Sequence, residues 1–364
     1  MGKDILDECY EEATRVLERN IFPGGFFASP GYHAIWARDS MITSLGGSLI
    51  LKFQKQFRDS LITLGGHQSK LGQIPNAILE HRGRKKQVDF LSIDSTLWFV
   101  IGEYVYRKRF GSELFRKHAG NIKRAVNWLE YQNFSEKGIL AQLPTTDWQD
   151  AFPHRYGHTI NTQALYYKVL NLIGEKEKAE KLKKAVNEID DLKLWNGSFY
   201  LPWRWKNHGK YKEEGEWFDS LGNLLAIVFE LADDNRAEKI LAHIKKNKIN
   251  FPFPVKAIYP PIKKGSKDWQ DYFDDCNAKT PYHYLNGGVW TYIGGFYILA
   301  LIKLGKTEEA ECELTRLAEA NLMSQFSEWI DGETGKTNGG GNQAWNAGMY
   351  ILAYESFKKG KALL

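Results

Sequence analysis

The sequence has few cysteines and no pair of them close together. Its 364 residues include only Cys9, Cys276 and Cys312, which are far apart and lack the spacing of metal ligands. An odd number of scattered cysteines excludes a scaffold held together by disulfides and favours a chain that keeps its thiols reduced.

A long hydrophobic run is also missing. The longest uncharged stretch, residues 285–302, approaches the ~20 residues that a membrane span needs, but it contains four glycines and an asparagine. We therefore expect a buried helix here and no membrane partner. Residues 1–8 are acidic and lack an apolar core, so we expect no signal peptide and a cytoplasmic location.

Charge of one sign is not in excess either. The net charge is +5, and lysine and arginine alternate with aspartate and glutamate along the chain. This pattern does not indicate a nucleic-acid partner. Metal-ligand spacing, a phosphate-binding loop and the Gly-x-Ser-x-Gly elbow of serine hydrolases are all absent, so we expect no metal or other cofactor. The oligomeric state cannot be read from the sequence.

Aromatic residues are abundant, at 14% of the chain, which suits a large core or a carbohydrate cleft. Helical periodicity dominates, and two kinds of helix alternate. Helices charged on one face are expected at residues 4–19, 53–65, 113–131, 175–191, 235–246 and 307–321. Helices apolar nearly all round are expected at residues 39–51, 94–106, 159–173, 217–232, 287–304 and 343–357.

A helix that is apolar on every side must be covered by other helices. Six such helices, each alternating with an exposed one, predict an all-α (α/α)6 barrel with six inner and six outer helices. We expect a single domain, residues 1–364, in which residues 195–211 form a β-hairpin or loop insertion and residues 250–284 a long structured loop.

Each inner helix is preceded by a polar and aromatic segment. These segments are residues 32–39, 89–94, 147–157, 214–219, 282–288 and 339–343. Because the inner helices of an alternating barrel all run in the same direction, their N-terminal ends should meet at one mouth. We therefore expect the six segments to converge on one pocket.

Two carboxylates in residues 144–157 are candidates for a proton donor. Asp147 and Asp150 lie close in sequence to Trp148, Phe152 and Tyr156. Apolar neighbours raise the pKa of a carboxyl group, so that it holds a proton near neutral pH. Asp147 follows two threonines and could instead bond backbone amides and stay ionised, so both residues remain candidates.

Other polar residues near these helices have two interpretations each. Glu328, between Phe326 and Trp329, is a candidate for activating water, although a glutamate is more often a solvated surface residue. Arg38 and Asp39 either cap a helix with a neighbouring ion pair or grip two adjacent hydroxyls of a sugar.

Several motifs resemble those of (α/α)6-barrel glycosidases. Trp36-Ala-Arg-Asp-Ser40, Gly72-Gln-Ile-Pro-Asn76 and Ile93-Asp-Ser-Thr-Leu-Trp-Phe99 resemble the amylo-α-1,6-glucosidase part of glycogen debranching enzymes, although Ala37 replaces a glycine of that family. The stretches at residues 149–157, 218–226 and 327–335 are similar to alkaline/neutral invertases. Asn286-Gly-Gly-Val-Trp290 is shared by both groups.

This resemblance implies an inverting, exo-acting glycoside hydrolase that cleaves an α-glucosidic bond, of sucrose or of an α-1,6 branch. It places the general acid at Asp150 and the general base at Glu328. The expected partner is a small carbohydrate substrate. The residues expected to bind it are Tyr32, Trp36, Arg38, Asp39, Asp94, Asp147, Trp148, Arg155, Gln163, Trp217, Asp219, His283, Asn286, Trp290, Gln343 and Trp345.

Two other functions fit the same barrel. A sugar epimerase moves a proton with histidines, and His33, His154 and His283 lie in the expected pocket loops. A sugar-binding protein without catalysis would show affinity for glucosides and no turnover.

Overall fold

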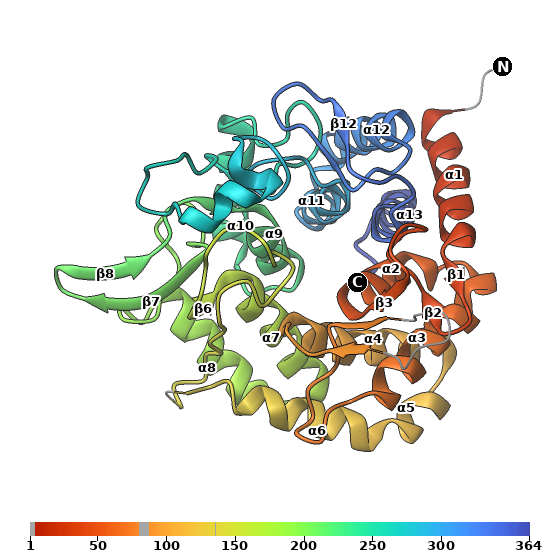
Figure 1. The fold of residues 1–364 in the computed structure, drawn as a ribbon, viewed down its shortest axis with the longest axis horizontal. Helices are drawn as coiled ribbons and strands as arrows, with labels where there is room; N and C mark the ends of the chain where they lie inside the picture. The colour runs from red at the N-terminus through yellow and green to blue at the C-terminus, as the bar shows by residue number, and fades with distance from the viewer. Residues whose placement is uncertain (1–3, 80–86, 135) are drawn as a thin grey trace.

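Inner helices alternate along the chain with outer helices that surround them, as the hydrophobic pattern predicts (Figure 1). The computed structural model describes residues 4–79, 87–134 and 136–364. The signal-peptide prediction is based on residues 1–8, and residues 1–3 of that segment lie outside the described residues.

The outer helices are amphipathic. In the helix Lys176–Asn187, for example, Ala179, Leu182, Ala185 and Val186 are buried while the lysines and glutamates face outward. The outer helices are α1 (Ile5–Arg19), α3 (Gln54–Gly66), α5 (Glu113–Lys117), α6 (Ala119–Glu130), α8 (Lys176–Asn187), α10 (Asp234–Lys246) and α12 (Thr307–Ser324).

The inner helices are buried over most of their length. They are α2 (Ala37–Gly47), α4 (Asp94–Phe110), α7 (Ile160–Ile173), α9 (Ser220–Val228), α11 (Thr291–Lys303) and α13 (Ala344–Lys358). In the described part of the chain they form a closed ring, because α2 contacts α4, and the contacts continue through α7, α9, α11 and α13 back to α2. The predicted (α/α)6 barrel is confirmed.

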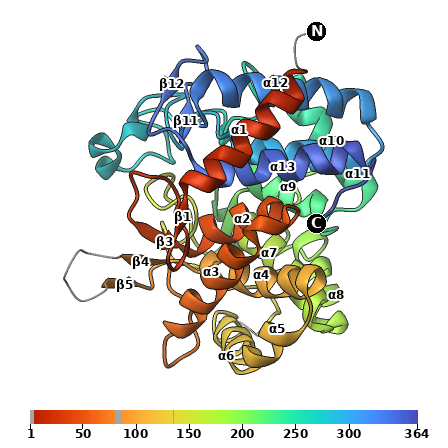
Figure 2. The same ribbon diagram turned by 90° about the vertical axis from the view of Figure 1, so that its right-hand side faces the viewer.

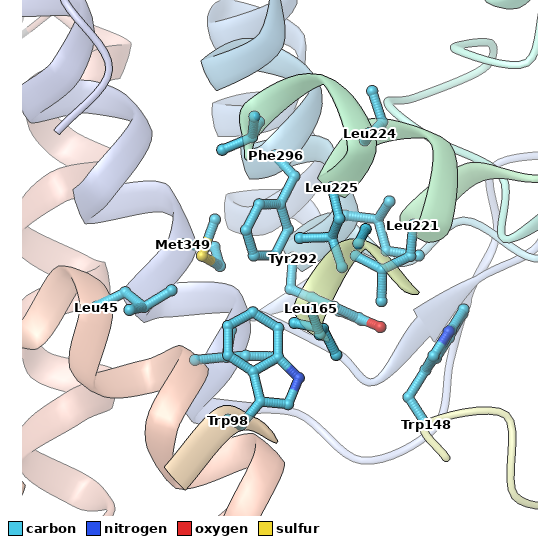
Figure 3. Close-up of a cluster of buried hydrophobic side chains, with 14 of the residues drawn as sticks. Leu45, Trp98, Trp148, Leu165, Leu221, Leu224, Leu225, Tyr292, Phe296 and Met349 are labelled. Atoms are coloured by element: carbon cyan, nitrogen blue, oxygen red, sulfur yellow. The ribbon is translucent and has the colours of Figure 1, made fainter. Parts of the chain in front are cut away.

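The outer helices cover this ring from outside. α3 packs on α2 and α4, α6 on α4, α8 on α7, α10 on α9, and α12 on α11 and α13, while α1 packs on α13. Large side chains fill the centre of the ring, among them Trp98, Leu165 and Phe296 (Figure 3). Apolar inner helices are stable here because each one is surrounded by helices.

Several predicted helix boundaries differ from the structure, and three of the differences have a clear structural reason. The helix expected at residues 113–131 is interrupted at His118, whose Nδ1 lies 2.6 Å from Glu103 Oε1 on α4. α9 begins at Ser220 because Asp219 is extended and caps it, with its carboxylate accepting from the amide of Gly222. α11 begins at Thr291 because Gly287 has a φ of 91° and Trp290 is extended.

Short antiparallel strands lie ahead of the inner helices. β3 (Ala34–Trp36) leads into α2 and pairs with β4 (Ala77–Leu79), which pairs with β5 (Gln87–Asp89). β6 (His158–Thr159) leads into α7 and pairs with β7 (Trp203–His208), which pairs with β8 (Tyr211–Glu214). The remaining pairs are β1 (Ile21–Phe22) with β2 (Gly25–Phe26), β9 (Phe218–Asp219) with β10 (Ile258–Tyr259), and β11 (Trp329–Ile330) with β12 (Thr337–Asn338).

These strands mark one end of the barrel. Figure 2 shows β3, β4, β5, β11 and β12 on the same side of the molecule, away from the C-terminal end of α13. The insertion expected at residues 195–211 contains a β-hairpin, β7–β8, which extends to Glu214. The segment 250–284 is a structured loop that contains β10 and the 3-10 helices η2 (Asp271–Asp275) and η3 (Asn277–Lys279).

The uncharged stretch at residues 285–302 forms a loop followed by the buried helix α11, which has 13 residues. Within the described residues, no helix is long and apolar enough to cross a membrane. The three cysteines are free thiols.

The contact between α2 and α13 depends on two glycines. A Cβ atom on Gly46 would lie 1.8 Å from the carbonyl oxygen of Gly348, and a Cβ on Gly348 would lie 2.5 Å from the carbonyl oxygen of Thr43. The two backbones therefore approach each other more closely than any larger residue allows.

Gly46→Ala should lower the free energy of unfolding by about 1–3 kcal/mol, because the added methyl group forces α2 and α13 apart. Gly66→Ala is the matched control, since Gly66 is exposed at the end of α3 and a Cβ there meets nothing within 4 Å. Urea unfolding followed by circular dichroism measures both variants. Equal stability of the two variants would contradict this account of the ring.

Candidate active site

A pocket of about 170 Å³ lies at the N-terminal ends of the inner helices. It is lined by Ala28, Tyr32, Trp36, Arg38, Asp39, Trp148, Asp150, Tyr284, Trp290, Glu328, Gln343 and Trp345. These residues come from the segments ahead of α2, α7, α11 and α13. At ~30 Å³ per water in the liquid, the volume corresponds to about six waters, which suits one sugar ring.

The predicted convergence of six segments is only partly correct. The segments ahead of α4 and α9 contribute no lining residue among those described. Their carboxylates, Asp94 and Asp219, are fully buried behind the pocket, where each pairs with an arginine.

The guanidinium of Arg38 lies in the wall of the pocket among three carboxylates. Its Nε is 3.6 Å from Asp39 Oδ2, its NH1 is 3.5 Å from Asp94 Oδ2, and its NH2 is 3.9 Å from Asp150 Oδ2. Because Arg38 is the second residue of α2, the inner helix fixes its position. The side chain is buried, and Asp94 and Asp39 raise its pKa against the effect of desolvation, so it stays charged.

Several polar atoms in this region lack a hydrogen-bond partner among the described residues. They are Nε and NH1 of Arg38, Oδ2 of Asp39 and the indole nitrogens of Trp148 and Trp345. Leaving such buried groups unpaired costs free energy, and a bound polar ligand removes that cost. Donors and a carboxylate acceptor close together match the hydroxyls of a sugar.

Aromatic rings form much of the pocket wall. Trp345 stacks on Tyr292 with ring centroids 4.2 Å apart, and Trp148 and Trp290 meet edge to face at 5.8 Å. Figure 3 shows Tyr292 and Trp148 beside the packed centre of the barrel, so these rings connect the pocket to the core. Arg38 lies 5.9 Å from the ring of Trp345, within cation–π range.

Asp150 has the properties of a proton donor. Desolvation raises its pKa to about 6, with Asp94 and Asp147 adding to the effect and Arg38 opposing it. Its side chain is still 39% exposed, so water in the pocket reaches it and moderates the desolvation. A ligand that displaces this water strengthens the effect.

Glu328 lies in the same pocket, in a different chemical environment. Tyr32 donates a hydrogen bond to Glu328 Oε1 over 3.2 Å. Desolvation raises the pKa of Glu328, while the bond from Tyr32 opposes that rise. The pKa of Tyr32 is itself raised, to about 12, so its hydroxyl remains a donor at neutral pH.

Asp39 is the third titratable carboxyl group in the pocket wall. Burial raises its pKa to about 7, against the opposing effect of Arg38. Asp39 lies beside the guanidinium of Arg38 in the first turn of α2, and the role of the two residues in ligand binding stays a prediction.

Asp147, Arg155 and Asp219 do not line the pocket but form a buried ion-pair cluster. The NH2 of Arg155 donates to Asp147 Oδ2 over 2.8 Å, and its NH1 donates to Asp219 Oδ2. Asp147 also accepts from the amide of Gln149 at 3.0 Å and from the side-chain amide of Gln142 at 2.9 Å. These bonds give Asp147 the structural role that its sequence context also allowed. Asp147, Arg155 and Asp219 were predicted to contact the ligand, but in the structure they hold the loop at residues 147–150 in position.

Four further predicted binding residues also lie outside the pocket lining. The side-chain amide of Gln163 forms hydrogen bonds with the backbone amide and carbonyl of Leu140. The side-chain amide of Asn286 does the same with Ile262 and also donates to the carbonyl of Ala278, so both side chains stabilise loops. His283 pairs with Asp331 at 3.0 Å. Trp217 is buried just ahead of β9.

Sequence reasoning missed Tyr284 and Ala28. Tyr284 lies in the segment 282–288 that was expected at the pocket, but no motif singled it out from its neighbours. Its φ of 45° turns the backbone there, and its carbonyl accepts from the indole of Trp290 at 3.0 Å. Ala28 carries no polar group that a sequence pattern would mark.

Two larger hollows, of about 560 and 570 Å³, lie on the described surface beside α3 and beside the Lys193–Gly197 loop. The charged residues that line them are mostly exposed to solvent, unlike the buried Arg38 and Asp39 of this pocket. No three histidine, cysteine or acidic side chains come together as a metal site within residues 4–79, 87–134 and 136–364.

Comparison with known families confirms the resemblance to invertases. Residues 206–359 match the family of alkaline and neutral invertases. The neutral/alkaline invertase 1 of Oryza sativa subsp. japonica, a mitochondrial protein, is 33% identical over 140 residues, which cover 37% of this chain and 22% of that invertase. The stretch matched to the family, residues 206–359, contains Glu328 but not Asp150. The resemblance to debranching enzymes stays a prediction.

Solved structures share the fold over nearly the whole chain. A GH63 mannosylglycerate hydrolase from Thermus thermophilus has a TM-score of 0.71 and 13% identity, covering 94% of this chain and 99% of that one. An uncharacterized conserved protein from the same organism has a TM-score of 0.73 and 13% identity, covering 94% and 98%. At this identity the likeness establishes the (α/α)6 barrel and nothing finer.

Arg155→Met should lower the free energy of unfolding by about 3–5 kcal/mol, because it leaves Asp147 and Asp219 buried without their shared partner. The control is Arg15→Met, which breaks an exposed pair with Glu12 and should leave stability close to wild type, since water screens that pair. Thermal and urea unfolding measure both. If Arg155→Met is as stable as the wild type and loses only ligand binding, Arg155 binds the ligand, as the sequence predicts.

Proposed function

We propose that this chain is an inverting, exo-acting glycoside hydrolase that cleaves an α-glucosidic bond. One observation carries the proposal: in a pocket sized for one sugar ring, Asp150 and Glu328 bring together carboxyl groups with raised pKa from segments far apart in sequence, beside Asp39, which pairs with Arg38. Perturbed carboxyl groups in a concave site are typical of acid–base catalysis. The match of residues 206–359 to invertases supports the reaction class.

In the proposed reaction the protonated Asp150 gives its proton to the glycosidic oxygen as the bond to the anomeric carbon breaks. Glu328, ionised, takes a proton from a water that attacks the anomeric carbon from the opposite face. The products are glucose of inverted configuration and a free leaving-group alcohol. Proton exchange with solvent then restores both carboxyl groups. Inversion rests on the invertase resemblance.

The proposed glucose ring is held by the atoms left without partners. The guanidinium of Arg38 and the carboxylate of Asp39 bind adjacent hydroxyls, and the indoles of Trp148 and Trp345 donate to others. Positioning of this kind fixes the anomeric carbon between the two catalytic carboxyl groups. Exo-action follows from the size of the pocket, which admits one ring at the end of a chain.

An epimerase is less consistent with the geometry. His33 packs against Phe27, His154 bonds Tyr272 and His283 pairs with Asp331, and none of the three histidines is among the pocket-lining residues. A proton relay through histidine therefore lacks a donor at the proposed sugar site.

The direct test is a panel of α-glucosides, including sucrose, isomaltose and panose, assayed for release of free glucose. The proposal predicts glucose from at least one of them. Conversion of a free sugar without bond cleavage would instead favour an epimerase, and affinity without turnover a binding protein.

Asp150→Asn and Glu328→Gln should each lower kcat by ~10²–10⁴-fold, the typical contribution of a general acid or base. Circular dichroism should show an unchanged fold, because both side chains line an open pocket. Asp331→Asn is the control, since Asp331 accepts amide bonds in a turn. Retained activity in both catalytic variants would refute the assignment.

The pH dependence should be bell-shaped. Asp150 must be protonated, so kcat/KM should fall as pH rises through about 6, its raised pKa. Glu328 must be ionised, so kcat/KM should also fall on the acidic side. A profile that rises through pH 6 to 8 would contradict the role of Asp150.

Tyr32→Phe should move only the acidic limb of this profile. It removes the hydrogen bond that lowers the pKa of Glu328, so that limb should shift to higher pH. The alkaline limb, set by Asp150, should stay in place.

A further inference from the structure

A second hollow adjoins the pocket on the far side of Asp150. It has a volume of about 420 Å³ and is lined by Pro144, Thr145, Asp150, Ala151, His154, Tyr272, Asp275 and Cys276. Asp150 lines both this hollow and the smaller pocket, whereas Glu328 lines only the smaller pocket. Asp150 can therefore contact a molecule in either space, whereas Glu328 borders the smaller pocket alone.

The walls of the hollow are joined by direct contacts. One wall is the loop at residues 144–154, and the other is η2 with the following Cys276. His154 Nδ1 lies 3.0 Å from the hydroxyl of Tyr272. Beneath them, the buried rings of Phe152 and Phe273 pack with centroids 4.4 Å apart. The hollow is thus formed before any ligand arrives.

We propose that this hollow is the leaving-group subsite of the enzyme, that it takes an uncharged, hydroxyl-rich leaving group, and that the leaving group can be longer than one sugar ring. The proposal rests on the glycoside hydrolase function above. The same geometry also supports the catalytic roles proposed above for Asp150 and Glu328.

The position of Asp150 is the main argument. A general acid must reach the glycosidic oxygen, which is the atom shared by the glucose and the leaving group. Such a residue borders the space on both sides of the bond, and Asp150 does so. The water-activating residue needs access only to the glucose side, and Glu328 has only that access.

The size of the hollow sets the length of the leaving group. Its volume exceeds that of the glucose pocket, about 420 against about 170 Å³. Tyr272 is 45% exposed in the wall, so part of its aromatic ring is accessible for packing against a sugar, as Tyr is at wet interfaces. A second neutral ring beyond the first therefore still contacts the protein.

The charge of the lining disfavours an anionic leaving group. Among the described residues, the lining contains the carboxylate of Asp275 but no lysine or arginine, and Asp150 is uncharged while it serves as the proton donor. Desolvation lowers the pKa of His154, so its imidazole is uncharged at neutral pH. The nearby Lys264 is paired with Asp274 at 2.6 Å. A carboxylate or phosphate on the leaving group would meet negative charge without a partner.

The first experiment compares two substrates in the variant Tyr272→Ala. One is a neutral α-glucosyl disaccharide that the wild type cleaves, and the other is α-glucosyl fluoride, whose leaving group is too small to fill the hollow. We expect kcat/KM to fall about tenfold for the disaccharide, as for loss of one good contact, and to stay near the wild-type value for the fluoride. An equal effect on both substrates would overturn the subsite.

This design separates the two proposals. If the wild type releases glucose from neither substrate, the glycoside hydrolase function fails. If the wild type cleaves both but Tyr272→Ala does not discriminate between them, only the leaving-group subsite fails.

The second experiment tests charge with a matched pair of variants. Asp275→Lys places a cation in the hollow, and Asp271→Lys places one on the same 3-10 helix outside the lining. Asp275→Lys should raise kcat/KM about tenfold for a glucoside with a carboxylate or phosphate on its leaving group, relative to the neutral glucoside, and Asp271→Lys should not. The proposal would be contradicted if Asp275→Lys left the ratio of kcat/KM for the charged and neutral glucosides unchanged, or if both variants changed this ratio equally.

The third experiment extends the neutral substrate by one ring on the leaving-group side. The trisaccharide should be cleaved with a kcat/KM at least equal to that of the disaccharide. A trisaccharide that is not cleaved would show that the hollow accepts one ring only.

Discussion

The burial of one positive charge, the guanidinium of Arg38, is the constraint on which the site depends. A charge taken out of water costs several kcal/mol unless it is paired. Asp39, Asp94 and Asp150 supply that pairing at 3.5 to 3.9 Å, distances at which charges attract but hydrogen bonds are incomplete. The cluster is therefore stable without a ligand and still has donors to offer to one. In the same way Arg38 holds Asp150 in place and limits the rise of its pKa.

The barrel makes this arrangement possible because each part of the cluster is fixed by an inner helix or by a loop that is tied to one. Arg38 and Asp39 begin α2 and Asp94 begins α4, while a second buried arginine, Arg155, ties the Asp147–Asp150 loop to Asp219 at the start of α9. Two arginines thus join helices that are distant in sequence, one in the pocket wall and one behind it. One wall of the hollow beyond Asp150 comes from the insertion at residues 250–284, and the other comes from the loop at residues 144–154. Tyr272 and Asp275 line this hollow but not the smaller pocket, so changes at these two residues would act on the proposed leaving-group side alone.

Much of this was predictable from the sequence, and the parts that were not have physical reasons. Alternating helix patterns predict the barrel because a helix apolar on all sides must be covered. The shared direction of the inner helices predicts a common mouth, and ten of the predicted site residues do line the pocket. Sequence alone could not separate ligand contacts from supports: Asp219 looks like a binding residue until its partner Arg155, 64 residues away, is placed beside it. The place of Tyr284 in the pocket wall depends on its own left-handed backbone conformation, which is rare for a residue other than glycine and which sequence patterns do not mark.

The central claim is that two carboxyl groups act from opposite faces of a glucose bound at this mouth. Proton NMR of the first glucose released from an α-glucoside tests it most directly, because the anomer is observed before mutarotation mixes the two forms. The account predicts β-glucose as the first product, lost together with activity in Glu328→Gln. α-Glucose as the first product would contradict it, since retention requires a covalent intermediate and gives Glu328 a different role.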